Sequence, residues 1–399
     1  MHGSASGGSP TITTGEKWLH RFNLLLALPA LLSLLAGIRH AVIGSGSHDL
    51  QWSGARLVLH RVDPFAVMLA QDPDHRILLA QIPNYLHELY ILLLPLGALS
   101  FEHARVLWAA CNCLFTLALL VALGRIYALD RTRILLLACL LLSSTPFRMA
   151  LGNGQQSLLE LLLFTAVFLP VPLLGRGLSL GLSYAKYSFS PPLFLFLLFR
   201  RQFRLLAISL LPPLLGLFFT WLLVRGNLFK LAFEPFLVGR TGVEIGPADL
   251  MSQIRLLMEG RLSPAVWHAI MLFAGLLSCI LFSSWLSRQR NLSPGRVAAL
   301  LSTASLLFLT HLTYDFVFLA VPLAAALRGS VSRVKASVLG LITLFWWGIK
   351  FGPNIEARGL EIPLFLLCFA VLCTILGCVG SRAFADPQPA PPFDDMQIA

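Results

Sequence analysis

Four side chains that could move a group between a phosphate and a hydroxyl stand in or beside long apolar runs of this chain. They are Asp49, Lys186, His311 and Asp315. A carboxylate can deprotonate an attacking hydroxyl, an ammonium can hold a phosphate as a point charge, and an imidazole exchanges protons near neutral pH. Ionisable groups beside apolar runs are costly, so their convergence on one face predicts a functional site.

Each of these residues also has a purely structural interpretation. Asp49 could be the N-cap of the helix that follows it, because a carboxylate there accepts the first free amides. Lys186 could snorkel to the nearest membrane interface, and His311 could be a satisfied histidine of the core. His311 and Asp315 are four residues apart, so a continuous helix would place them on one face. Asp63, in the sequence VDPF, favours an Asx turn.

Composition places the chain in a membrane. Of its 399 residues 57% are hydrophobic and only 12% are charged, and the mean hydropathy is +0.77. These values are not those of a soluble globular protein. The net charge of +11 comes from small basic clusters between apolar runs, as expected of loops that face an anionic cytoplasmic leaflet. We therefore predict membrane lipids, and no nucleic acid, as partners.

The apolar runs predict an all-α polytopic membrane protein. The runs that could span a bilayer cover residues 22–43, 104–124, 134–150, 157–174, 205–224, 266–286, 297–310, 316–327, 336–352 and 362–379. A further run, 178–199, is interrupted by Lys186 and by the SPP at 190–192. It predicts two short helices that meet at an outward-facing turn lining a polar cavity. The total is about 12 transmembrane helices, with both termini cytoplasmic.

Residues 44–105 predict one large first extracytoplasmic loop. Its apolar segment Tyr90–Ser100 is short and contains Pro95 and Gly97. If that segment spanned the membrane, the arginines of 125–133 would face outward, against the positive-inside bias. We therefore predict that it lies in the interface, so that the loop carries two juxtamembrane helices.

The domain organisation follows from these spans. A Gly/Ser-rich tail over 1–21 and a Pro-rich tail over 380–399 are predicted to be disordered and cytoplasmic. Between them we predict a catalytic module over 22–224. A second part, over 225–379, would consist of an outer loop and the C-terminal transmembrane helices.

The predicted topology gathers polar side chains on the outer face. We assign catalysis to Asp49 and His311, and binding of a donor phosphate to Lys186 with Arg240 or Arg255. Sugar or acceptor binding is assigned to Arg56, Tyr85, His87, Gln155 and Asp315. The sequence has no Gly-rich nucleotide loop and no metal-ligand spacing, so we predict no cofactor and no metal. Such a site would take its donor from the bilayer, which favours a polyprenyl phosphate sugar and a lipid or glycan acceptor.

Short motifs follow one another in a defined order over roughly residues 45–205. They are Asp49 with Gly54 and Ala55, the DPF of 63–65, Tyr85, then Leu107, Trp108 and Asn112, Pro146, Gly154 and Gln155 with Ser157, and Lys186 with Pro191, Arg200 and Arg201. A segment with His311 and Asp315 comes later. This arrangement resembles glycosyltransferase family 87, the polyprenyl-phosphate-mannose-dependent mannosyltransferases of the GT-C superfamily.

The resemblance implies a GT-C fold with two juxtamembrane helices in the first outer loop. It also implies that mannose is transferred with inversion and that Asp49 is the general base. The corresponding location is the extracytoplasmic face of a bacterial inner (plasma) membrane. The sequence departs from the family pattern in the order Pro83, Asn84, Tyr85 and in Gln156, which bears on the identity of the sugar.

A polytopic lipid or solute transporter, or a flippase, is the alternative. Such proteins often have internal repeats with broken helices at matching positions of two halves. The broken run 178–199 has no counterpart in the second half of the chain. This asymmetry favours an enzyme, a hexosyltransferase.

Overall fold

The computed structural model describes residues 14–43, 50–241, 248–289, 291–349 and 361–384. Every regular element within these ranges is a helix, which confirms the predicted all-α class. Asp49 and most of the two predicted tails lie outside the described residues. Helix α1 already begins at Thr14, inside the first predicted tail.

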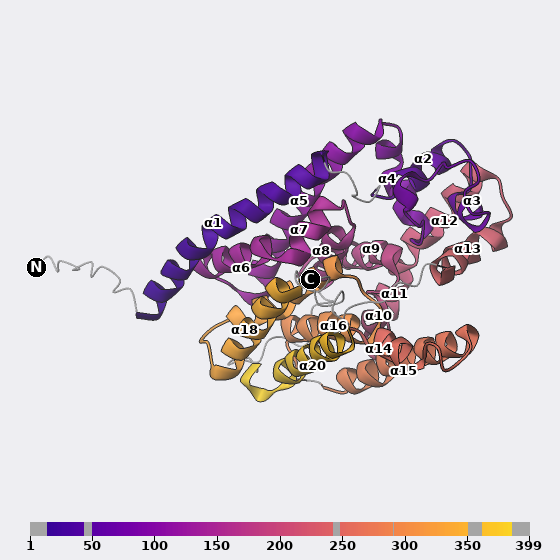
Figure 1. The fold of residues 1–399 in the computed structure, drawn as a ribbon. Coiled ribbons are helices and arrows are strands. Elements are labelled where there is room, and N and C mark those ends of the chain that lie inside the picture. The colour runs from indigo at the N-terminus through magenta and orange to yellow at the C-terminus, as the bar shows by residue number, and fades with distance from the viewer. Residues whose placement is uncertain (1–13, 44–49, 242–247, 290, 350–360, 385–399) are drawn as a thin grey trace, which may run out of the picture.

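The first half of the chain occupies the upper and middle part of Figure 1. Its helices are α1 (Thr14–Ile43), α2 (Trp52–Leu59), α3 (Pro64–Leu69), the short η1 (Leu78–Ala80), α4 (His87–Gly97), α5 (Phe101–Tyr127), α6 (Arg131–Ser143), α7 (Thr145–Gly152), α8 (Ser157–Ala166), α9 (Leu173–Ser183), η2 (Tyr184–Lys186), α10 (Pro191–Phe199), α11 (Phe203–Ser209), α12 (Leu211–Val224) and α13 (Leu228–Thr241). The predicted first outer loop therefore carries α2, α3 and α4, one helix more than the two predicted.

The second half lies mainly in the lower part of the same view (Figure 1). Its described elements are α14 (Leu250–Met258), α15 (Pro264–Ser287), α16 (Pro294–Phe308), η3 (Thr313–Leu319), α17 (Ala320–Leu327), α18 (Arg333–Gly348), α20 (Glu361–Gly380) and η5 (Arg382–Phe384). Helix α15 packs on α10, so the broken helix pair of the first half contacts the second half directly.

Five segments of the described chain are long and apolar enough to cross a membrane. They are Arg21–Ile43, Phe101–Tyr127, Phe203–Val224, Pro264–Ser287 and Pro363–Gly380. Helices α6 and α7 form a sixth span if they are counted together, although they are bent by 66°. Shorter helices occupy other predicted spans, such as α8 with 10 residues and α16 with 15. The larger number of about 12 therefore stays a prediction.

The breaks between helices have local causes. Ser144 follows α6, and its hydroxyl accepts a hydrogen bond from the Phe147 amide at 3.2 Å, which caps α7. A proline in the first turn of α7 leaves no helical hydrogen bond unmade. The predicted break of the run 178–199 is confirmed, because α9 ends at Ser183 and α10 begins at Pro191.

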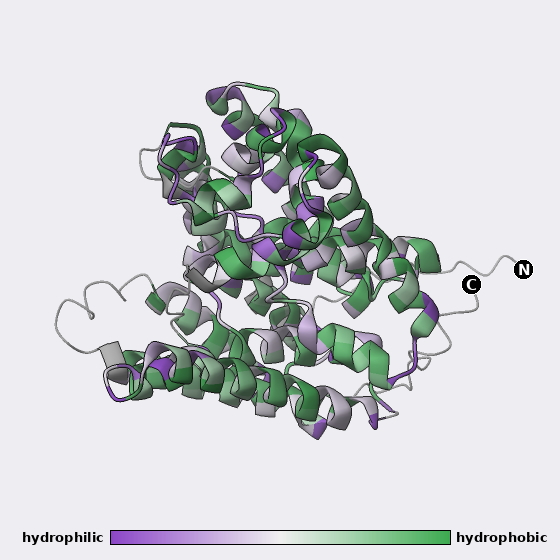
Figure 2. Cartoon of the chain, turned by 90° about the vertical axis from the view of Figure 1, so that its right-hand side faces the viewer, coloured by the Kyte–Doolittle hydropathy of each residue, from purple (hydrophilic) through white to green (hydrophobic). Residues whose placement is uncertain are grey.

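The long helices carry bands of exposed apolar side chains. Figure 2 shows these helices predominantly in green, the colour of hydrophobic residues. Leu25 of α1 is 72% exposed and Phe273 of α15 is 68% exposed. Large exposed apolar surfaces on helices of this length are suited to contact with lipid acyl chains. The protein is therefore an integral membrane protein.

Two glycines bring α4 close to its neighbours α2 and α12. A Cβ at Gly216 of α12 would lie 2.4 Å from the backbone nitrogen of Glu88 in α4. A Cβ at Gly97, the last residue of α4, would lie 2.9 Å from the backbone nitrogen of Arg56 in α2. Backbone atoms cannot turn aside as the end of a side chain can, so these glycines set the spacing of the three helices.

Replacing Gly216 with alanine should therefore destabilise the protein by about 1–3 kcal/mol, the usual effect of overpacking a close contact. Thermal unfolding of the purified protein in detergent would measure the loss. Gly340→Ala is the matched control, because a Cβ at this glycine of α18 meets nothing within 4 Å and alanine favours a helix. A Gly216→Ala variant as stable as this control would contradict the close contact of α4 with α12.

Candidate functional site

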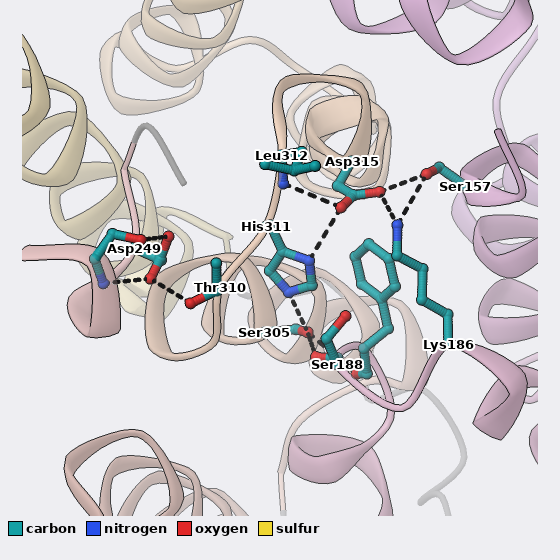
Figure 3. Close-up of polar contacts among 11 residues, drawn as sticks. Ser157, Lys186, Ser188, Asp249, Ser305, Thr310, His311, Leu312 and Asp315 are labelled. Carbon is teal, nitrogen blue, oxygen red and sulfur yellow. Dashed lines mark hydrogen bonds and ion pairs between the residues drawn. The ribbon is translucent and has the colours of Figure 1, made fainter. Parts of the chain in front are cut away.

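A buried carboxylate, that of Asp315 in η3, is the centre of the polar contacts in Figure 3. Its Oδ1 accepts a hydrogen bond from Lys186 Nζ at 2.5 Å and another from the hydroxyl of Ser157. Its Oδ2 accepts one from the Leu312 amide at 3.2 Å. Only 2% of Asp315 is exposed, so these donors replace the water that a buried charge would otherwise lack.

The cation of this site, Lys186, is the last residue of the short turn η2 between α9 and α10. Its ammonium lies 4.9 Å from the ring centre of Tyr314 and 5.2 Å from that of Phe189, positions in which a cation is attracted by the ring faces. The side chain is 13% exposed. Lys186 is thus paired inside the protein, which the snorkelling alternative did not predict.

His311 lies between α16 and η3 and is not part of a helix. The continuous helix that would have carried both His311 and Asp315 is therefore absent, yet the two side chains meet. His311 Nδ1 is 3.5 Å from Asp315 Oδ2, and Nε2 is 3.5 Å from the Ser305 hydroxyl. Both distances are long for hydrogen bonds, and catalytic contacts often tighten only when substrate binds. We refer to Ser157, Lys186, His311 and Asp315 as the Asp315 cluster.

Two contacts hold the segment that carries His311. The imidazole stacks on Phe189 with ring centres 4.2 Å apart, and Phe189 stacks on Phe318 at 3.8 Å. The hydroxyl of Thr310 donates to Asp249 at 3.2 Å, and Asp249 caps the N-terminus of α14 (Figure 3). The segment is therefore fixed from two sides, by an aromatic stack and by α14.

The first loop is joined to the Asp315 cluster at two points. The amide of Leu86 donates to the Ala185 carbonyl at 3.0 Å, one residue before the lysine of the cluster. The side-chain amide of Gln156 donates to the Leu50 carbonyl at 2.9 Å. The residue after Gln156 is the serine that binds Asp315. The loop is thus attached beside both the lysine and the serine.

The acid predicted to act as a base, Asp49, lies outside the described residues. The next two residues, Leu50 and Gln51, both adopt left-handed backbone, with φ of 52° and 64°. The N-cap position of α2 belongs to Gln51, so the N-cap interpretation of Asp49 is wrong for this helix. The Gln51 side chain donates to the Ile82 carbonyl at 3.0 Å and accepts from the Tyr90 hydroxyl at 3.0 Å.

Tyr85, assigned to sugar or acceptor binding, is buried beside the Asp315 cluster. Burial raises the pKa of its phenol, and the neighbouring Tyr314, Asp315 and Glu160 raise that pKa further. The phenol is therefore neutral and can donate a hydrogen bond. The structure thus brings Tyr85 to the same place as the cluster, although the chain reaches it from the first loop.

Gln155 and Arg56 received the same assignment but have different surroundings. Gln155 is buried and lies two residues before Ser157. The Arg56 guanidinium donates to the Gly97 carbonyl at 3.4 Å and lies 5.0 Å from the ring centre of Trp52. Gln155 is thus next to the cluster in the chain, whereas Arg56 ties α2 to the end of α4.

His87 takes part in a second polar contact, between α4 and α13. Its Nε2 lies 2.9 Å from the Leu231 carbonyl, and burial lowers the pKa of the imidazole. Glu234, also on α13, is fully buried 3.4 Å from the ammonium of Lys230. Burial, and then the neighbouring carboxyl of Asp63, raise the pKa of Glu234 to about 7. Asp63 itself caps α3, which confirms the predicted turn.

The structure gives less support for the two arginines assigned to the donor phosphate. Arg240 belongs to α13, and its side chain lies outside the described residues. Arg255 on α14 is paired with Glu259 at 3.2 Å and lies 5.0 Å from the ring centre of Trp267. Its guanidinium therefore contributes to the packing of α14 on α15.

Three residues at this site received no role from the sequence. Ser157 was only part of a family motif, yet its hydroxyl donates to Asp315. Glu88 and Glu160 are buried acids. Each stands within an apolar run, in HELYILLLP and SLLELLLF. The pattern that singled out Lys186, a charge within an apolar run, also applies to both glutamates.

The arrangement can hold an anion next to groups that move protons. Lys186 supplies the positive charge, while His311 and Tyr85 can accept or donate protons. Within the described ranges, no group of three or more His, Cys, Asp or Glu side chains is arranged to hold a metal ion. Lys186, His311 and Tyr85 can together stabilise a negative charge and transfer protons.

The sequence model of one protein family matches the chain. It is that of glycosyltransferase family 87, and the match covers residues 89–312. That range is more than half of the 399 residues. It includes Ser157, Lys186 and His311 and ends three residues before Asp315. No curated protein and no solved structure gave a significant match.

The pair of Lys186 and Asp315 can be tested with a double-mutant cycle. Lys186→Met or Asp315→Asn alone would leave one buried charge without its partner, which costs about 3–5 kcal/mol. The double variant removes both charges and should recover most of that stability. Unfolding of the three variants in mixed detergent micelles would measure the coupling, and losses that simply add would contradict the pair.

The raised pKa of Glu234 predicts that stability falls as the pH rises. The folded protein keeps a proton on Glu234 up to about pH 7, whereas the unfolded chain loses it near the ordinary value of 4.5. The folded state therefore binds more protons between these values, and its stability declines across that window. Glu234→Gln should flatten the decline, as measured by thermal unfolding from about pH 5 to about pH 8. The exposed Glu259→Gln should keep the wild-type slope, and equal slopes in both variants would contradict the role of Glu234.

Proposed function

Because the chain belongs to glycosyltransferase family 87, we propose that it transfers mannose from a polyprenyl phosphate carrier to a lipid or glycan acceptor. The observation that carries the proposed donor is the Asp315 cluster. In this cluster, Lys186, which lies between α9 and α10, shares the carboxylate of Asp315 with His311. A lipid-linked phosphate is the leaving group in such a transfer, and a fixed ammonium stabilises the charge that develops on it.

Lys186 is the proposed ligand of that phosphate. Its ammonium contacts Asp315 and lies 3.5 Å from the Ser157 hydroxyl. A phosphate bound there would place a second anion around one cation, so the site needs further positive charge. We assign that charge to Arg240, near the end of α13, or to Arg255 of α14.

Asp49 is the proposed general base, which takes the proton of the acceptor hydroxyl as the sugar is transferred with inversion. The hydrogen bond from Gln156 to the Leu50 carbonyl supports this role. It fixes the residue that follows Asp49 next to the start of α8, where Ser157 lies. Asp49 would then deprotonate the acceptor hydroxyl, and Lys186 would hold the leaving phosphate, from adjoining segments.

His311, Tyr85 and Gln155 are proposed to form the pocket for the sugar and the acceptor. Asp315 positions two of the active groups, because it contacts both Lys186 and His311. Arg56 and His87 would contribute by holding α2 and α13 against α4. The acceptor itself is a lipid or glycan that reaches this pocket from the membrane surface.

The site is proposed to face the extracytoplasmic side of a bacterial inner (plasma) membrane. Both termini would be cytoplasmic, with about 12 helices in the membrane. The support for this orientation is the distribution of arginines, which cluster in the loops between apolar runs.

Replacing Asp49 with asparagine should lower sugar transfer by about 10²–10⁴-fold, the usual contribution of a general base. Purified protein would be incubated with a panel of polyprenyl phosphate sugars, and the glycosidic product would be quantified. Asp74→Asn is the matched control, because Asp74 is an exposed acid of the same loop that pairs with Arg76. This control should keep wild-type activity. Full activity in the Asp49→Asn variant would remove Asp49 from the mechanism.

A further inference from the structure

Two buried acids beside the Asp315 cluster lack a hydrogen-bond partner among the described residues. Glu160 of α8 is 1% exposed, and Glu88 in the first turn of α4 is 4% exposed. No carboxyl oxygen of either residue makes a hydrogen bond of ordinary geometry within the described part of the chain, although the Lys186 backbone amide is close enough to act on Glu160. Glu234 also lacks such hydrogen bonds in the described ranges but lies 3.4 Å from the ammonium of Lys230, and Asp249 caps a helix. We call Glu88 and Glu160 the acid pair.

The acid pair adjoins the site proposed for the donor. Glu160 follows Ser157 by three residues, so the two side chains share one face of α8. Among the neighbouring charged groups, Lys186 and then Glu88 have the largest electrostatic effects on the Glu160 carboxyl. Glu160 in turn acts on the phenol of Tyr85. Glu160 thus lies near both the proposed phosphate ligand and a residue of the proposed sugar pocket.

The cation of the Asp315 cluster, Lys186, is already paired with Asp315 and so does not neutralise these acids. Lys186 Nζ is 2.5 Å from Asp315 Oδ1, so its charge is already balanced. An ionised Glu88 or Glu160 would therefore be an uncompensated buried charge, which is very costly. Burial accordingly raises the pKa of Glu88 to about 8, so this side chain is a neutral carboxylic acid at neutral pH.

Even a neutral carboxyl is destabilising here. A buried polar group without partners costs about 1–3 kcal/mol, because it has lost its hydrogen bonds to water. Apolar residues surround Glu160 in SLLELLLF, and a further apolar residue would pack there without that cost. Residues that lower stability in this way are typical of binding sites, where a ligand supplies the missing partners.

We propose that Glu160, together with Glu88, binds hydroxyl groups of the donor sugar, an inference that rests on the proposed function. A neutral carboxyl offers one donor and several acceptor positions, and each sugar hydroxyl both donates and accepts. A phosphate is bound better by cations and so belongs to Lys186. The donor therefore occupies two subsites. Its phosphate binds Lys186, and its sugar ring binds the acid pair.

The test compares two lipids bound by the purified full chain in nanodiscs, polyprenyl phosphate mannose and bare polyprenyl phosphate. Glu160→Met should bind the mannose lipid roughly tenfold more weakly, the effect of about one hydrogen bond to a buried group, and the bare lipid as the wild type does. Glu160→Gln keeps a donor and an acceptor and should lose less. Without lipid, Glu160→Met should unfold at a higher temperature, because an unpaired buried carboxyl has been removed.

Leu161→Met, a buried neighbour on the same helix, is the matched control and should bind both lipids as the wild type does. Unchanged affinity of Glu160→Met for the mannose lipid overturns the inference. Equal weakening of both lipids, or a lower unfolding temperature, also overturns it, because either result indicates a structural role. If the wild type binds neither lipid, the proposed function itself fails and the inference falls with it.

Discussion

The ion pair of Lys186 and Asp315 is the contact on which the interior of this protein depends. Two opposite charges are withdrawn from water inside an apolar bundle, and such a pair is stable only when the remaining lone pairs also find donors. Ser157 and the Leu312 amide supply them. Because these groups come from α8, η2 and η3, the pair joins η3 to segments that precede Asp315 by 129 residues or more. The rings next to the ammonium are those of Tyr314 in η3 and of Phe189, three residues after Lys186.

Under the proposed function, the same pair defines what the donor phosphate has to displace. A phosphate that approaches Lys186 competes with Asp315 for one ammonium. Asp315 would keep its bonds from Ser157 and the Leu312 amide, so it can share the lysine without being left unsolvated. His311, 3.5 Å away, is the group placed to compensate the carboxylate if the lysine turns toward a phosphate. The cluster therefore keeps donors for the Asp315 carboxylate even when the lysine turns away from it.

The sequence was enough to predict most residues of the Asp315 cluster, but not how their side chains contact one another. Lys186, His311 and Asp315 stood out because charges in apolar runs are costly, and they do meet. Their contact could not be derived from periodicity, since His311 lies in a non-helical segment. The number of membrane spans could not be predicted from the sequence either. For example, the apolar run 134–150 is continuous in the sequence, but a helix cap at Ser144 divides it into two helices. Glu160 was overlooked although it is also a charge within an apolar run, and its burial without a hydrogen-bond partner is visible only in the structure.

The left-handed backbone at Leu50 and Gln51 limits how this segment can change during evolution. That conformation costs a residue with a side chain roughly 1–2 kcal/mol, a cost that glycine avoids. Glycine at position 51, however, would lose the hydrogen bonds that Gln51 makes with Ile82 and Tyr90. At position 51, glycine would give the less strained backbone, whereas glutamine keeps the hydrogen bonds that anchor the loop. Few substitutions at Leu50 and Gln51 would therefore leave both the backbone and the hydrogen bonds of the loop undisturbed.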